Sequence, residues 1–129
     1  MNRAMVLCYN MEGERADLVR NLALSAGIQP FSVPREAYLQ TIGALCGLME
    51  PTEEAYNGKG FPQEMMLMAF FEKGMLTRFL DSFREKGVPS VPLKAMLTEN
   101  NSRWNSLELH AELMEEYAYF SSLQEKKKQ

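Results

Sequence analysis

The sequence predicts an α/β fold, with α+β as the alternative, in which two β-α-β-α units share one mixed four-stranded sheet. Two observations support this prediction. When the sequence is shifted by 60 residues its halves align, so that Leu7 falls on Leu67 and Gly27 falls on Gly87. Each half also has the same order: an apolar strand, an amphipathic helix, a glycine and a second apolar segment. A helix between two strands requires a parallel crossover, because only antiparallel neighbours can be joined by a tight turn.

The strands are predicted from short apolar runs. The first strand of each half is expected at 5–9 and 66–70, and the second at 29–33 and 91–97. A strand without polar alternation is typical of the centre of a sheet, where both faces are covered. We therefore expect the strand order 2-1-3-4. The direction of the central pair stays open, although a pseudo-twofold axis would make it antiparallel.

The helices follow from apolar residues that recur every three or four positions. The first helix has such a stripe at Leu18, Val19, Leu22, Ala23 and Ala26, and the third at Leu76, Phe79, Leu80 and Phe83. A further helix is expected to end each half, at about 35–48 and 106–123. Asn105 and Glu108 have the spacing of a capping box for the last of these helices.

The chain of 129 residues is predicted to form a single domain. Its parts are a first repeat (1–50), a linker (51–63), a second repeat (64–124) and a tail (125–129). The linker contains Asn57-Gly58 and Gly60, which are typical turn residues, so we expect an exposed loop, with a short helical turn after Thr52. The lysines of the tail are expected to form a frayed, solubilising end.

The composition excludes several classes of protein. Hydrophobic residues make up 46% and charged residues 24%, which is typical of a soluble globular protein. The net charge of −3 argues against a nucleic-acid partner. The longest apolar run, 65–71, is far shorter than a membrane span, and the N-terminal apolar stretch is too short for a signal peptide. We therefore expect a cytoplasmic protein with no membrane partner and no cofactor.

Metal and disulfide chemistry have little support in the sequence. Cys8, Cys46 and His110 are the only cysteines and the only histidine, and they are scattered. A typical zinc site needs about four ligands with paired spacing, so no metal site is predicted. Two reduced, buried thiols are the expected state, while a disulfide between Cys8 and Cys46 stays open.

One polar segment distinguishes the second half from the first. Between the second strand and the last helix, 93–106 contains four candidate ligand-binding or partner-binding residues: Lys94, Thr98, Asn101 and Trp104. Ligands of open α/β sheets bind at the carboxyl ends of strands, and helix amino ends favour anions. Each residue also has a structural interpretation, since Thr98 and Asn101 can fix a loop, Trp104 can pack as a hydrophobic staple and Lys94 can protect a sheet edge.

The same segment resembles a small bacterial family, the domain of unknown function numbered 3783. The pattern K-A-x-L-T-x-x-N-x-x-W is present from Lys94 to Trp104, followed by a helix rich in Leu and Glu. The resemblance covers about 65–122, and it implies that the first half is a degenerate copy without the motif. The family brings no established activity, substrate or catalytic residue.

These observations favour a non-enzymatic binding or interaction module, with 98–104 as its recognition surface and self-association as one mode. The first alternative is a small-molecule or anion-binding regulatory domain that uses Lys94 and the helix end near Asn105. The second alternative is a small enzyme, which would require Lys94, His110 and a glutamate to converge. No catalytic residue is predicted, because Glu108, Glu112 and His110 have the pattern of a solvated helix surface.

Overall fold

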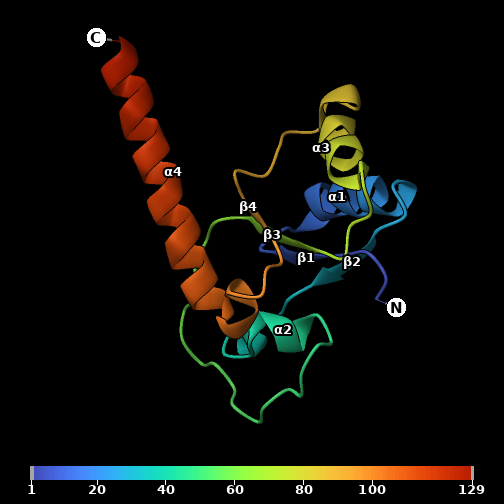
Figure 1. Ribbon diagram of the computed structural model, residues 1–129, viewed down its shortest axis with the longest axis vertical. Coiled ribbons are helices and arrows are strands. Elements are labelled where there is room, and N and C mark those ends of the chain that lie inside the picture. Colours follow the sequence, from blue (N-terminus) through green and yellow to red (C-terminus); the bar gives the residue numbers. More distant parts are fainter. Residues whose placement is uncertain (1, 129) are drawn as a thin grey trace.

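The computed structural model describes residues 2–128, in which four strands form one mixed sheet in the predicted order β2-β1-β3-β4 (Figure 1). The same succession of strand, helix, strand and helical segments occurs twice. The first half comprises β1 (Met5–Tyr9), α1 (Gly13–Ser25), β2 (Gln29–Ser32), the 3₁₀ turn η1 (Arg35–Ala37) and α2 (Ile42–Leu45). The second comprises β3 (Met65–Ala69), α3 (Met75–Glu85), β4 (Leu93–Met96), η2 (Asn101–Arg103) and α4 (Ser106–Lys128).

The central pair of strands is antiparallel, which answers the question that the sequence leaves open. Leu7 lies opposite Leu67 at the middle of the β1–β3 ladder, while β2 and β4 each run parallel to their neighbour. The residues that follow the two central strands, Asn10 and Phe70, both have a left-handed φ of 62°. The two halves are therefore arranged about an approximate twofold axis through the Leu7–Leu67 pair.

Two hydrophobic cores lie on opposite faces of the sheet. On one face, α1 and α3 pack on the sheet, and on the other α2 and the start of α4 cover it (Figure 1). Alternate residues of β1 and β3 point into each core, and every residue of both strands is buried. The apolar, non-alternating sequence of these strands follows from this position between two layers.

The prediction of one continuous helix over 35–48 is wrong, because the backbone is not helical in the middle of this range. Thr41 is extended and forms an isolated bridge with Asn105 of the other half. Its hydroxyl oxygen accepts a hydrogen bond from the N–H of Ala44 at 3.0 Å, which starts α2 as an N-cap. A tertiary contact and a capping residue thus divide the helical pattern into η1 and α2.

The linker is held to the body of the molecule and has no helical turn after Thr52. The side-chain amide of Gln40 donates to the carbonyl of Thr52 at 2.7 Å and accepts from its N–H at 2.8 Å. Further along, Asn10 donates to the carbonyl of Phe61 at 2.7 Å. Residues 51–55 are exposed as predicted, whereas Phe61 is buried in the core.

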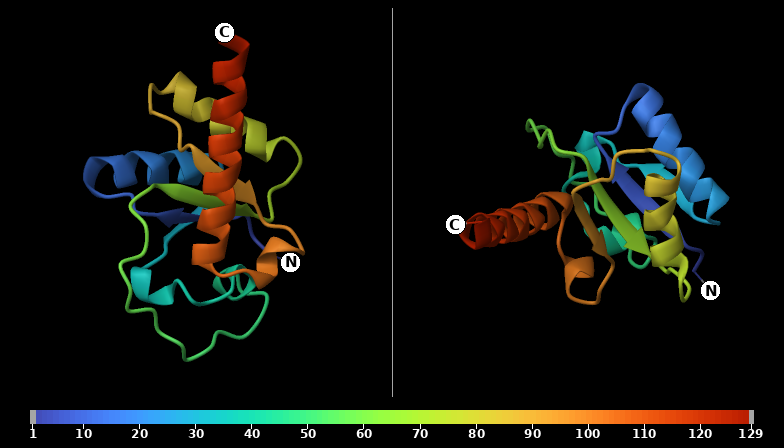
Figure 2. Two further views of the ribbon diagram at one scale, coloured as in Figure 1. Left: turned by 90° about the vertical axis from the view of Figure 1, so that its left-hand side faces the viewer. Right: turned by 90° about the horizontal axis from the view of Figure 1, so that it is seen from above.

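The last helix begins as the sequence predicts and continues further than expected. Asn105 and Glu108 form the capping box, each accepting the other's backbone N–H at 3.0 Å or less. The helix continues to Lys128, so the backbone of the predicted tail is helical up to that residue, and Gln129 lies outside the described residues. Figure 2 shows that the C-terminal half of α4 projects beyond the sheet.

The two cysteines are buried free thiols in different cores. Cys8 belongs to the core under α1 and α3, and Cys46 to the core on the other face of the sheet. The sheet separates them, so the disulfide alternative is not realised. Burial raises the pKa of each thiol to about 11, which keeps both protonated and poorly nucleophilic at neutral pH.

Candidate functional site

The structure brings two of the four candidate residues, Thr98 and Asn101, into direct contact. The Thr98 N–H donates to Oδ1 of Asn101 at 2.8 Å, and the Asn101 N–H donates to Oγ1 of Thr98 at 3.0 Å. The Asn101 amide also donates to the carbonyl of Met96 at 2.9 Å. Asn101 is 7% exposed. Its hydrogen-bonding groups are therefore used to close the turn after β4.

Trp104 joins the loop to the first half of the chain. Its side chain is half-buried against the core that contains Ile42 and Leu109. Its carbonyl accepts the N–H of Ile42 at 2.7 Å, and the N–H of Ser106 donates to the carbonyl of Tyr38 at 3.1 Å. This geometry matches the structural interpretation of Trp104 as a packing residue at the start of α4.

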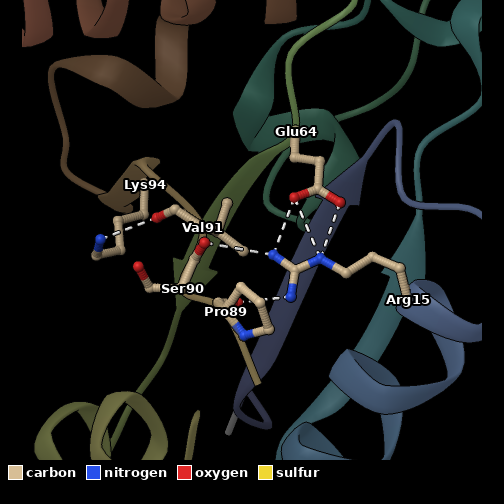
Figure 3. Close-up of polar contacts among 6 residues, drawn as sticks. All are labelled: Arg15, Glu64, Pro89, Ser90, Val91 and Lys94. Atoms are coloured by element: carbon tan, nitrogen blue, oxygen red, sulfur yellow. Dashed lines mark hydrogen bonds and ion pairs between the residues drawn. The ribbon is translucent and has the colours of Figure 1, made fainter. Parts of the chain in front are cut away.

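Lys94 makes its hydrogen bond to a different loop, the one that leads from α3 into β4 (Figure 3). Its ammonium donates to the carbonyl of Val91 at 2.9 Å. Arg15 of α1 donates to the two preceding carbonyls, those of Pro89 and Ser90, so three successive carbonyls between α3 and β4 receive cationic donors. Lys94 thus has an intramolecular partner, as a loop-supporting residue would.

Arg15 is a positioning residue that the sequence did not reveal. Its guanidinium forms a bidentate ion pair with the carboxylate of Glu64, with Nη2–Oε1 and Nε–Oε2 distances of 2.9 and 3.0 Å (Figure 3). Both side chains are about three-quarters covered. The ion pair connects α1 to the residue that precedes β3. Such a contact between distant segments cannot be predicted from the residue pattern within either segment.

His110 belongs to an aromatic cluster at the base of α4. Its ring stacks on Phe61 with centroids 3.8 Å apart, and Nε2 lies 2.8 Å from Oε1 of Gln63. Nearby, the hydroxyls of Tyr9 and Ser106 are hydrogen bonded at 2.7 Å. Burial lowers the pKa of His110 and raises that of Tyr9. These groups hold the linker and α4 on the sheet.

The lowered pKa of His110 gives a pH-dependent prediction. The unfolded chain, with an ordinary histidine pKa near 6.5, binds a proton more readily than the folded protein. Above the pKa of the unfolded chain, His110 makes its full contribution to the free energy of unfolding. This contribution is lost as the pH falls through the lower pKa of the folded protein. Urea unfolding at pH 7.5 and pH 5 should show a smaller pH-dependent loss for His110→Gln than for the wild type. An equal loss in both proteins would contradict the prediction.

The part of the chain from 2 to 128 offers no other clear marker of a bound group. Among the side chains that the structure describes, every buried nitrogen or oxygen has a hydrogen-bond partner. The described residues also contain no cluster of three metal-ligating side chains, and none of their helices has the length and apolar character of a membrane span.

A groove lies on the surface between α4 and the start of β4. Two adjoining cavities of about 410 and 140 Å³ lie along it, with Pro92 and Leu93 on one side and Tyr117 on the other. Phe120 and Lys94 line its far end. Most residues that line the groove are apolar. The polar ones are Gln63, Glu64, Lys94 and Glu116.

The α4 side of this groove continues the helix's buried stripe. Leu109, Leu113, Tyr117 and Phe120 follow one another at intervals of four, four and three, so they share one face of the helix. Leu109 and Leu113 are 1% and 8% exposed, whereas Tyr117 and Phe120 are 53% and 62% exposed. The apolar stripe therefore extends past the sheet that covers its first half. We call residues 115–124 the overhang.

A separate cavity, of about 490 Å³, lies near the opposite edge of the sheet. It is lined by Phe31, Cys46 and Phe70, with Arg3 as its only cation.

Comparison with known families concerns the half that carries the motif and the groove. Residues 64–120 match the domain of unknown function DUF3783. The DUF3783 match begins just before β3 and includes Lys94, Thr98, Asn101 and Trp104, as the resemblance in the sequence implies. It ends at Phe120, inside the overhang. No curated protein and no solved structure gives a significant match to the chain.

Proposed function

We propose that this protein is a non-enzymatic interaction module and that its partner surface is the groove between the overhang and the start of β4. The observation that carries the proposal is the continuation of the buried stripe into the exposed Tyr117 and Phe120. Exposed apolar patches rimmed by polar residues mark interaction sites, and aromatic residues are enriched at the centres of such sites.

The hydrogen bonding of the loop supports the choice of the groove over 98–104. Thr98 and Asn101 satisfy each other, so a ligand would have to break these bonds before it could use them. Lys94 and His110 have intramolecular partners of their own. Because these side chains already form intramolecular hydrogen bonds, an interaction module is favoured over an enzyme in which Lys94 and His110 would act on a substrate.

We also propose a cytoplasmic location and a bacterial origin, the latter from the DUF3783 resemblance alone. The buried free thiols of Cys8 and Cys46 are typical of a reducing compartment. In addition, the first half is proposed to be a degenerate copy of the second. The matching left-handed residues Asn10 and Phe70 and the central Leu7–Leu67 pair support this idea.

Site-specific photo-crosslinking in cells tests the proposed surface. A photoreactive amino acid is placed at Phe120 in the groove or, as a control, at Glu99 in the loop, where the side chain is 91% exposed. We expect position 120 to give a discrete polypeptide adduct, either with another copy of this chain or with a different protein, and position 99 to give none. Adducts at position 99 alone, or none at either position, would contradict the proposal.

A further inference from the structure

The overhang lacks the packing that normally stabilises a helix. Isolated helices shorter than about 12 to 15 residues are marginal in water, and protein helices gain most of their stability from a packed apolar face. Figures 1 and 2 show the C-terminal end of α4 projecting beyond the sheet, and the start of β4 lies across the groove from Tyr117 and Phe120. Four large apolar side chains of this segment remain exposed: Tyr117, Tyr119, Phe120 and Leu123.

The charges of α4 are distributed asymmetrically along its length. Residues 112–116 (Glu-Leu-Met-Glu-Glu) include three glutamates, and the sequence 124–128 (Gln-Glu-Lys-Lys-Lys) has three lysines and one glutamate. The exposed aromatic residues of the stripe, Tyr117 and Phe120, lie between these two segments. An acidic segment, an apolar segment and a basic segment therefore follow one another along one helix.

This order is complementary to itself when the helix is reversed. In an antiparallel pair centred on Phe120, residues 112–116 of one helix lie level with residues 124–128 of the other. Opposite charges then meet at both ends, and the aromatic residues meet in the middle. A parallel pair would place glutamates beside glutamates and lysines beside lysines, which is unfavourable.

We propose that the overhang binds a second copy of this chain, forming a twofold-symmetric dimer through antiparallel α4 helices. The inference rests on the proposed function and specifies the partner. In an isologous contact, the same patch serves both subunits, and a self-complementary charge order is what such a contact requires. The groove beside Pro92 and Leu93 receives the aromatic residues of the second helix.

Sedimentation equilibrium of the full chain tests the proposal. The wild-type mass should rise from 14.8 kDa toward twice that value as concentration increases. Tyr117→Ser combined with Phe120→Ser should raise the dimer Kd at least tenfold, as expected for central aromatic contacts. Tyr119→Ser is the matched control: Tyr119 is 62% exposed, like Phe120, but lies off the stripe, so its Kd should change less than about threefold.

Charge variants test the orientation of the helices. Reversing Lys126, Lys127 and Lys128 to glutamate should weaken the dimer at least tenfold at low salt. Replacing Glu112, Glu115 and Glu116 by lysine in the same chain should restore the dimer, because the acidic and basic segments have then exchanged their charges. Loss of association without restoration would contradict the antiparallel arrangement. Circular dichroism confirms that each variant is folded.

The outcomes also separate this inference from the proposed function. A wild-type protein that stays monomeric at all concentrations, while position 120 crosslinks to a different protein, overturns the dimer and leaves the interaction surface intact. A monomer with no adduct at position 120 overturns both. If the wild type dimerises and its Kd is unaffected by Tyr117→Ser combined with Phe120→Ser, the dimer forms through another surface. That result overturns both the proposed α4 dimer and the proposal that the dimer contact lies in the groove.

Discussion

Replacing Asn101 by alanine should lower the free energy of unfolding by about 2–4 kcal/mol. The substitution removes the acceptor for the Thr98 N–H and the donor for the Met96 carbonyl, and Asn101 itself is buried although residues 98–100 of the turn are exposed. A buried hydrogen bond contributes about 1 kcal/mol, and leaving its partner unsatisfied costs about 1–3 kcal/mol. Urea denaturation followed by circular dichroism measures the change.

Asn100→Ala is the matched control for this prediction. Asn100 is the adjacent residue of the same type, but it is exposed and its side chain makes no capping hydrogen bond. We expect its stability to stay within about 0.5 kcal/mol of the wild type. If the two variants were equally stable, Asn101 would not be the residue that holds the turn.

Gly43→Val should destabilise the protein by about 2–3 kcal/mol, because Gly43 of α2 lies close to the backbone of η2. A Cβ atom at this position would lie 3.0 Å from the carbonyl oxygen of Ser102 and 2.5 Å from Cε of Met49. The Met49 side chain can move, whereas the Ser102 carbonyl belongs to the backbone. Overpacking of this kind costs about 1–3 kcal/mol, and valine adds two further methyl groups.

The neighbouring residue provides the comparison for Gly43→Val. Ala44→Val introduces the same side chain one position further along α2, at a half-buried site. We expect a loss below about 1 kcal/mol, from the lower helix propensity of valine alone. Thermal unfolding of both variants measures the difference, and equal losses would show that the approach of Gly43 to Ser102 is unimportant.

The strand order was predictable because it depends on local sequence. The non-alternating apolar runs of β1 and β3 require cover on both faces, and that requirement places them at the centre. The direction of the central pair depends on how two distant segments meet, which no local pattern contains. The division of 35–48 has the same origin, because the spacing of Ile42 and Leu45 suits a helix while Thr41 bridges to Asn105.

The candidate site was predictable only in part. The hydrogen bonds of Thr98 and Asn101 span three residues, so their structural interpretation was available from the sequence. The burial of Phe61 was hidden by the turn residues around it. The exposure of Tyr117 and Phe120 was hidden too, because their spacing is that of a core stripe and only the arrangement of the sheet shows where its cover ends.

Hydrogen exchange of the overhang tests the central claim most directly. Amides of residues 117–123 are measured in dilute and in concentrated protein, with the sheet as an internal reference. The dimer predicts that exchange in this segment slows at least tenfold at high concentration, while β1 and β3 keep their rates. If residues 117–123 exchanged equally fast at both concentrations, the second half of α4 would not be covered by a second copy of the chain.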